Sequence, residues 1–138
     1  TFLSIREDDI SAHKMHSEWV EISAAAAEKI NAAKSSGRRV IAGGTTTTRA
    51  LEGVAALGGF RTHSGFVNLF IQPGFEFKVI DGLITNFHLP KSTLLVLASA
   101  FAGLPRRGGG REYVLRAYEE AVNQRYRFYS FGDAMLIV

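Results

Sequence analysis

Hydrophobic residues in the first sixty positions group into runs of helical and strand length, separated by glycines. Alanine, the best helix former, fills positions 24–27, and Ser23 before it has the hydroxyl of a helix N-cap. Val40, Ile41 and Ala42 form a short apolar run that ends at two glycines. The predicted elements are a helix between Ser23 and Gly37, a buried strand over 38–42, and a second helix over 49–57 with threonines 45–48 supplying its N-cap.

The second half of the chain changes period. Phe75, Phe77 and Val79 alternate with Glu76 and Lys78 in the two-residue period of a strand. An Asp-Gly pair follows at 81–82 and predicts a hairpin, with 83–88 as the returning strand. The remaining predicted elements are a strand over 66–71, a helix capped by Ser92 or Thr93 and running to Ala102, a helix over 114–125, and a buried strand over 134–138. The glycine- and arginine-rich stretch 103–110 is expected to be a flexible loop, too rich in glycine to pack.

The alternation of helices and strands predicts an α/β fold, a mixed sheet flanked by helices in α/β/α layers. With 138 residues, of which 46% are hydrophobic, the whole chain has the size and composition of one globular domain. The absence of cysteine excludes disulfides, thiolate metal sites and cysteine nucleophiles. The longest apolar run is interrupted by Ser99 and is far shorter than the ~20 residues of a membrane span. Because the sequence lacks an initial methionine, we expect it to be part of a longer protein in a reducing, cytoplasmic setting.

Charge is distributed unevenly along the chain, although the net charge is only +3. Residues 1–21 carry a net charge of −3, whereas residues 106–127 carry +3. A phosphate-rich partner is therefore expected to meet the second stretch. The same pattern also fits a solvated helix face.

A first candidate site lies where Gly43 and Gly44 precede the threonines and Arg49. Glycines let a ligand approach the backbone, and a helix N-terminus offers unpaired N–H groups and partial positive charge to an anion. The hydroxyls of Thr45 and Thr46 and the guanidinium of Arg49 add donors for a phosphate or carboxylate. The spacing is not that of a P-loop, and the alternative is that the threonines only cap the helix.

A second candidate contains His13, His16 and Glu18. Two histidines three residues apart can share a helix face, and a histidine beside a carboxylate can act as an acid–base pair. The alternative is a surface cluster without chemistry. A zinc site is disfavoured because no third ligand has suitable local spacing, so no metal is expected.

A third candidate crowds polar groups at the junction of a strand and a helix, where open α/β sheets place ligands. Its members are Asn86, His88, Lys91, Ser92 and Thr93. His88 stands between two apolar residues and could equally be a satisfied core histidine. The density of polar residues favours a site.

A fourth candidate spans 126–133, where aromatic residues interleave with Arg127 and the segment ends at Asp133. Such aromatics can stack on bases while arginine holds phosphates. They can also be the hydrophobic end of a helix. Asp133 precedes an apolar run and is a candidate for a buried carboxylate.

Together these segments resemble one family, the S-adenosylmethionine:tRNA ribosyltransferase-isomerases of queuosine biosynthesis. The most specific match is the run Asn86-Phe87-His88-Leu89-Pro90, which is not a generic pattern. The other matching motifs lie at 13–19, 44–46, 49–52, 69–71, 77–94, 99–103, 126–128 and 132–137. The resemblance covers nearly the whole chain. It implies that 1–138 is the C-terminal portion of the family's protein, without the N-terminal portion and a β-barrel module.

The resemblance implies a reaction. The family transfers and isomerises the ribosyl unit of S-adenosylmethionine onto a 7-aminomethyl-7-deazaguanine base at the tRNA wobble position, giving epoxyqueuosine and releasing adenine and methionine. S-adenosylmethionine is then a consumed substrate, so no cofactor is expected. The implied partners are S-adenosylmethionine and this tRNA. A monomer is expected for the family, whereas core surface exposed in a fragment favours self-association.

The same chemistry indicates residue roles. The sulfonium acidifies the neighbouring C5′ protons, so a base that works near neutral pH, His88 or His16, would remove one. A carboxylate near the positive sulfonium would come from Glu18 or Asp133. The expected substrate-binding residues are Thr45, Thr46, Arg49, Asn86, Lys91, Ser92 and Thr93, with the first three on the methionine carboxylate. The expected tRNA-binding residues are Arg106, Arg107, Arg111 and Arg127.

Two other functions remain open from the sequence. The chain could be a non-catalytic tRNA- or nucleotide-binding module, whose affinity would fall steeply with salt. It could also be an α/β domain without a ligand, which would make the polar cluster at 85–93 accidental.

Overall fold

The computed structural model describes residues 15–103 and 109–138, and it contains a first strand, Glu18–Ile22, that the sequence pattern did not predict. In chain order the elements are β1 (Glu18–Ile22), α1 (Ala24–Ser35), β2 (Ile41–Gly43), α2 (Thr45–Ala56), β3 (His63–Val67), β4 (Gly82–Asn86), α3 (Thr93–Ala102), α4 (Gly110–Asn123) and β5 (Ala134–Ile137). The predicted caps of two helices are confirmed, since the hydroxyls of Ser23 and Ser92 accept backbone N–H groups of α1 and α3.

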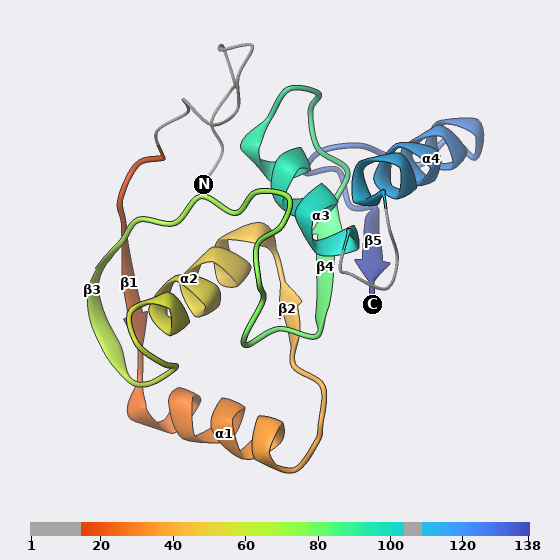
Figure 1. Ribbon diagram of the computed structural model, residues 1–138. Coiled ribbons are helices and arrows are strands. Elements are labelled where there is room, and N and C mark those ends of the chain that lie inside the picture. The colour runs from red at the N-terminus through yellow and green to blue at the C-terminus, as the bar shows by residue number, and fades with distance from the viewer. Residues whose placement is uncertain (1–14, 104–108) are drawn as a thin grey trace.

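The strands form two sheets. A three-stranded mixed sheet has the order β2-β4-β5, with β2 parallel and β5 antiparallel to β4. A two-stranded antiparallel sheet pairs β1 with β3. Helix α2 lies between the two sheets, and α3 and α4 lie together beside β4 and β5 (Figure 1). The predicted α/β class, with a mixed sheet flanked by helices, is confirmed.

The core forms where α2 and α3 cover one face of the mixed sheet. Leu83 of β4 and Phe101 of α3 are fully buried within one cluster that also contains Val54 of α2. A second cluster joins α3 to α4 through Ala98, Ala102 and Val114. The helices thus hold β4, the central strand, in place from one side.

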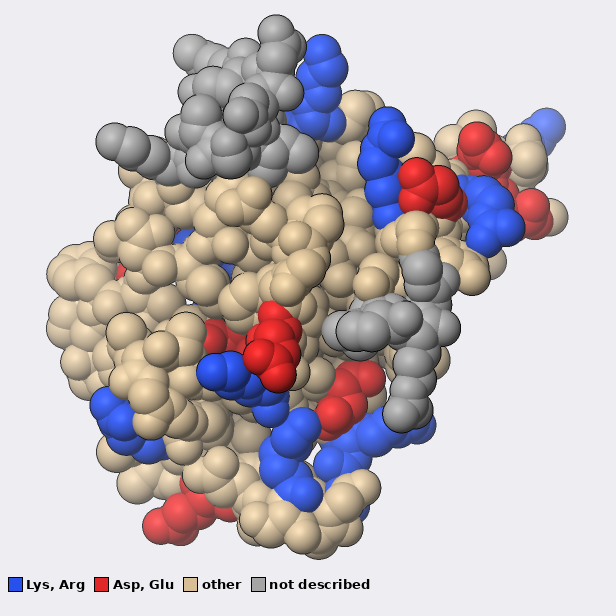
Figure 2. Space-filling model, viewed as in Figure 1, with Lys and Arg blue, Asp and Glu red and all other residues tan. Residues whose placement is uncertain are grey.

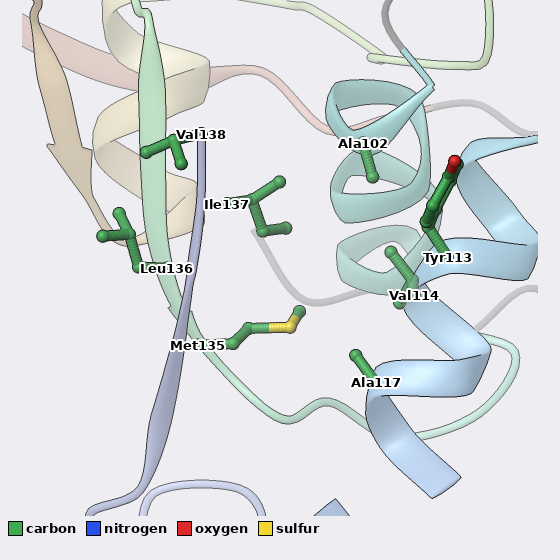
Figure 3. Close-up of a pocket in the computed structure, with 8 residues that line it drawn as sticks. All are labelled: Ala102, Tyr113, Val114, Ala117, Met135, Leu136, Ile137 and Val138. Carbon is green, nitrogen blue, oxygen red and sulfur yellow. The ribbon is translucent and has the colours of Figure 1, made fainter. Parts of the chain in front are cut away.

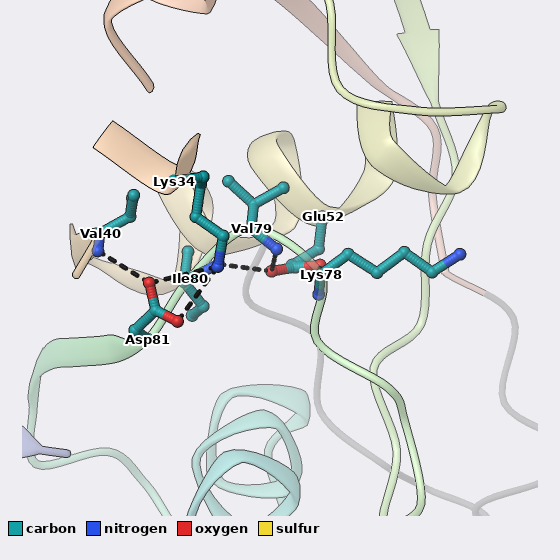
Figure 4. Close-up of polar contacts among 7 residues, drawn as sticks. All are labelled: Lys34, Val40, Glu52, Lys78, Val79, Ile80 and Asp81. Atoms are coloured by element: carbon teal, nitrogen blue, oxygen red, sulfur yellow. Dashed lines mark hydrogen bonds and ion pairs between the residues drawn. The ribbon is translucent and has the colours of Figure 1, made fainter. Parts of the chain in front are cut away.

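The predicted strand over 75–80 and the hairpin at 81–82 are wrong. The segment is irregular because the carboxylate of Glu52 on α2 accepts the backbone N–H groups of Lys78, Val79 and Ile80 at 2.8–2.9 Å (Figure 4). N–H groups bound to a side chain cannot join a strand ladder. The alternation of Phe75 and Phe77 with polar residues has another cause. Their half-buried rings contact each other edge to face and pack against the core.

Asp81 joins the two parallel strands instead of turning a hairpin. Its carboxylate accepts the N–H of Val40 at 2.9 Å and pairs with Lys34 of α1 at 3.1 Å (Figure 4). Its own N–H donates to the carbonyl of Val40 at 2.7 Å. The start of β4 is therefore fixed against the chain that enters β2, which sets the parallel register.

Three further element predictions differ from the structure. Strand β3 lies at His63–Val67, mostly before the predicted 66–71, because it pairs residue by residue with β1. Helix α2 begins at Thr45 with Gly44 as its N-cap, so the threonines form its first turn and do not cap it. Strand β5 is an edge strand with Leu136 59% exposed, not a buried one.

The outer face of the mixed sheet is apolar, and no helix or strand of residues 15–103 and 109–138 covers it. Ile41, Ile84 and Leu136 come from its three strands and are each at least 40% exposed. Along β5, Met135 and Ile137 point toward α3 and α4, where they help to line a pocket of about 270 Å³, whereas Leu136 points the opposite way (Figure 3). The self-association expected of a fragment remains a prediction, and this face is the surface through which it would occur.

Gly103 and Gly110, at the two ends of the glycine-rich stretch, pack against each other, whereas 104–108 lie outside the described residues. Gly110 is buried at the start of α4. A Cβ added there would lie inside van der Waals contact of the Ser99 carbonyl oxygen and the Gly103 nitrogen. The ends of α3 and α4 therefore meet backbone to backbone, which only glycine allows.

Replacing Gly110 with alanine is expected to lower the free energy of unfolding by about 2 kcal/mol, because the new methyl group must push α4 away from α3. Urea unfolding followed by circular dichroism measures this loss. Gly43→Ala is the matched control, since nothing lies within 4 Å of a Cβ at Gly43. Equal stability of the two variants would contradict the close packing.

Candidate functional site

The site forms at the carboxyl ends of β2 and β4, where the chain leaves the sheet toward α2 and α3. The N–H of Gly44 donates to the carbonyl of Ile84 at 2.8 Å, which places the N-terminus of α2 beside the end of β4. Two residues beyond Ile84, Asn86 ends β4, and the buried Phe87 and half-buried His88 follow. This is the edge at which open α/β sheets bind ligands.

His88 is held at both its backbone and its ring. Its N–H donates to the hydroxyl of Tyr118 on α4 at 2.8 Å. Its Nε2 lies 2.7 Å from Oγ1 of Thr85, a residue of β4 that is 3% exposed. Burial lowers the pKa of His88 from its ordinary 6.5, so the ring is neutral at pH 7. Burial also raises the pKa of Tyr118, which stays a neutral phenol.

The third and fourth predicted segments come together here. The N–H of Tyr129 donates to the carbonyl of Phe87 at 2.9 Å. The side-chain amide of Asn86 donates to the carbonyl of Asp133 at 3.1 Å. The rings of Phe87 and Phe128 pack with centroids 5.0 Å apart. Two segments some forty residues apart in sequence thus make one surface.

A groove of about 350 Å³ opens between these segments. It is lined by Asn86, His88, Leu89, Leu94, Tyr129 and Ser130. Of the predicted catalytic and substrate-binding residues, His88 and Asn86 line it. Apolar walls with a few convergent polar groups are typical of small-molecule sites.

The other predicted residues of the third segment take different positions. Ser92 is 1% exposed, where its hydroxyl caps α3 and donates to the carbonyl of Leu89 at 2.8 Å. Thr93 is 4% exposed in the first turn of α3. Lys91 is exposed and has a left-handed backbone with φ of 53°. Ser92 and Thr93 thus support the loop that carries His88.

Asp133 and Arg127 form an ion pair beside the groove. The carboxylate of Asp133 accepts the backbone N–H of Arg127 and pairs with its guanidinium at 3.0 Å. Asp133 is half-buried and not buried as expected, with a side chain 26% exposed. Hydrogen bonds from Arg127 lower the pKa of the Asp133 carboxyl, which is therefore ionised at neutral pH.

Replacing Arg127 with glutamine is expected to raise the pKa of Asp133 toward its ordinary value of 3.8. A carboxyl whose pKa is lower in the folded state adds stability above its ordinary pKa, and the added stability is lost as pH falls through the lowered one. A carbon-13 NMR titration of the aspartate carboxyls measures both variants. Titration of Asp133 at its ordinary value in the parent chain would contradict the pairing.

The first and second predicted segments also meet, between α2 and β1. Arg49 is 4% exposed and forms an ion pair with Glu18 at 2.8 Å. Its remaining guanidinium nitrogens donate to the carbonyls of Leu69 at 3.1 Å and His16 at 3.5 Å. Arg49 and Glu18, expected to bind opposite charges of the substrate, thus bind each other.

A second groove, of about 460 Å³, lies between β1 and the first turns of α2. Glu18, Glu21 and the exposed Thr46 line it. Thr45 is 7% exposed and does not. His16 is exposed and precedes a strand, so it does not share a helix face with His13, which lies outside the described residues.

The predicted tRNA-binding arginines are only partly described. Arg106 and Arg107 lie outside the described residues. Arg111 is exposed on α4, where basic and acidic side chains are intermixed on the visible face (Figure 2). Arg127 is exposed and bound to Asp133.

Sequence reasoning missed three residues that organise the site. Thr85 orients the His88 ring, Tyr118 fixes the His88 backbone, and Glu52 holds the segment that leads into β4. The only sequence signal for Tyr118 is its place in a helical pattern. The only signal for Thr85 and Glu52 is that they lie within motifs that match the family.

Two negative findings hold for residues 15–103 and 109–138. Within these ranges, no cluster of three or more histidine or acidic side chains could hold a metal ion. Their helices are also too short or too polar to cross a membrane.

Comparisons with known proteins agree on one family. A family model described as queuosine biosynthesis protein matches residues 1–137. A Carboxydothermus hydrogenoformans protein named S-adenosylmethionine:tRNA ribosyltransferase-isomerase is 60% identical over 138 residues, and the chain spans 39% of its length. A protein of the same name from Nostoc sp. is 51% identical, with 33% of its length spanned. A crystal structure of S-adenosylmethionine tRNA ribosyltransferase from Thermotoga maritima matches 86% of this chain and 39% of its own, with 47% identity and a TM-score of 0.76.

Proposed function

Because the chain belongs to the queuosine biosynthesis protein family, we propose that it supplies part of the site of an S-adenosylmethionine:tRNA ribosyltransferase-isomerase. The proposed enzyme transfers and isomerises the ribosyl unit of S-adenosylmethionine onto a 7-aminomethyl-7-deazaguanine wobble base, forming epoxyqueuosine in tRNA. Adenine and methionine leave, so S-adenosylmethionine is a substrate and not a cofactor. The chain spans about two fifths or less of these relatives, and the proposal concerns the whole protein.

One observation carries the proposal beyond the family match. The run 86–90, which is the most specific match, and the segment 126–133 converge on the groove that contains His88 and Asn86. They meet there through direct hydrogen bonds, not merely through a shared core. A binding module would need only a basic surface, whereas the exposed face of α4 in view carries both signs of charge (Figure 2).

The geometry supports specific roles in this reaction. His88 is a neutral imidazole in a half-buried groove, suited to hydrogen bonding or proton transfer with the substrate. Asp133 is an ionised carboxylate beside the same groove, and it can favour a sulfonium only in exchange for its ion pair with Arg127. We assign the methionine carboxylate to Thr46, since it is exposed in the second groove at the N-terminus of α2, where partial positive charge favours an anion. His16 remains the other candidate base.

The test is adenine release by the full-length protein that contains this chain, mixed with S-adenosylmethionine and tRNA bearing the 7-aminomethyl-7-deazaguanine base. We expect adenine to appear by chromatography, and to vanish when the tRNA is omitted. Tight tRNA binding without adenine release would favour a non-catalytic binding module instead. In that case the tRNA affinity should fall steeply with salt.

A further inference from the structure

The buried hydroxyl of Thr85 has one hydrogen-bond partner within the described residues, Nε2 of His88 at 2.7 Å. Thr85 is 3% exposed in the centre of the mixed sheet, so water does not replace a missing partner. A buried hydroxyl left without an acceptor costs about 1–3 kcal/mol. The arrangement is therefore favourable when the hydroxyl donates its hydrogen to Nε2.

An Nε2 that accepts a hydrogen bond carries no proton. A neutral imidazole then has its single proton on Nδ1. The opposite tautomer would direct the Nε2 proton at the Thr85 oxygen and leave the threonine hydrogen unpaired. His88 itself is neutral at pH 7, because burial lowers its pKa.

The second ring nitrogen of His88, Nδ1, is not enclosed by the described residues. Nδ1 makes no hydrogen bond with the described residues, and it is not among their buried unpartnered atoms. His88 lines the groove together with Asn86 and Ser130. The ring nitrogen available to a ligand is therefore Nδ1, and its chemistry depends on whether it carries the proton.

We infer that Thr85 is a positioning residue that holds His88 as the neutral Nδ1–H tautomer, so that His88 presents a hydrogen-bond donor to the groove and not a base. A donor there suits an oxygen or ring nitrogen of a nucleoside. The role toward substrate rests on the proposed function, whereas the tautomer does not. Proton abstraction then belongs to another group, for which His16 is the candidate within this chain.

Nitrogen-15 NMR of histidine-labelled protein at pH 8 tests the tautomer directly, because protonated and unprotonated ring nitrogens resonate far apart. His88→Gln assigns the signals. We expect the unprotonated nitrogen of His88 to be Nε2 in the parent and in Thr85→Ser, which keeps the hydroxyl. Thr85→Val should shift the population toward Nε2–H. An Nε2–H tautomer in the parent, or no change in Thr85→Val, would overturn the inference.

Measurements of adenine release then test the donor role of His88 separately from the tautomer and from the proposed function. In the full-length enzyme, His88→Asn retains an N–H donor near the position of Nδ1, whereas His88→Ala retains none. We expect adenine release by His88→Asn to exceed that of His88→Ala by about tenfold or more. Equal loss in both variants would overturn the donor role while leaving the NMR result intact. No release by the parent would refute only the proposed function.

Discussion

Replacing Glu52 with glutamine is expected to destabilise the fold by about 3 kcal/mol. The carboxylate is 1% exposed, and its two oxygens accept three backbone N–H groups from 78–80. Glutamine keeps one oxygen and turns an NH₂ donor toward at least one N–H, which leaves a buried donor unpaired. Each such loss costs about 1–3 kcal/mol, and more where the acceptor was charged.

Urea unfolding followed by circular dichroism measures the loss as a lower midpoint at an unchanged slope. Glu28→Gln is the matched control, because Glu28 is exposed on α1 and its removal should change stability by less than ~0.5 kcal/mol. A loss below ~1 kcal/mol in Glu52→Gln would show that the segment 78–80 has other acceptors.

Replacing His88 with alanine is expected to reduce adenine release by the full-length enzyme about 100-fold or more. Among the described residues, alanine removes the only imidazole that lines the groove, which is the group that Thr85 holds in place, and it keeps the backbone N–H that Tyr118 binds. Loss of one preorganised hydrogen-bond donor lowers the turnover number by about 10²–10³-fold. The effect should fall on kcat more than on KM, since it concerns the transition state.

His63→Gln is the control for this prediction. His63 lies on β3, paired opposite Ile22 in the other sheet, and it does not line the His88 groove. Its replacement should leave adenine release within about twofold of the parent. Near-normal turnover in His88→Ala would remove His88 from the site and leave the family match without this catalytic assignment.

The predictable parts of the fold are those with a local cause. The hydroxyls of Ser23 and Ser92 cap helices a few residues away, so the signals lie within one window of sequence. The strand-to-helix junction at His88 was predicted for the same reason, since polar residues accumulate there within eight positions. The convergence of that junction with 126–133 was not predicted, because no local pattern joins two segments some forty residues apart.

The parts that were missed have distant causes. The alternation of 75–80 is real, but Glu52 takes its N–H groups from 26–28 residues away. Arg49 has the residue type and position of an anion-binding group, yet Glu18 neutralises it across 31 residues. A pattern of hydrophobic and polar positions does not show which distant side chain will form a hydrogen bond or ion pair with a given group. The partners of buried charged and polar groups are therefore the feature that is hardest to predict from a short window of sequence.

The placement of β4 at the centre of the mixed sheet determines when the groove forms during folding. One neighbour, β2, ends some forty residues earlier, and the other, β5, begins about fifty residues later. Contacts between residues so far apart in sequence form slowly, because the chain loses the entropy of closing a long loop before the strand pairing stabilises it. On the ribosome the chain can build α1, α2 and the β1–β3 pair first. The groove at His88 is completed only once 126–137 has been synthesised and has docked on β4.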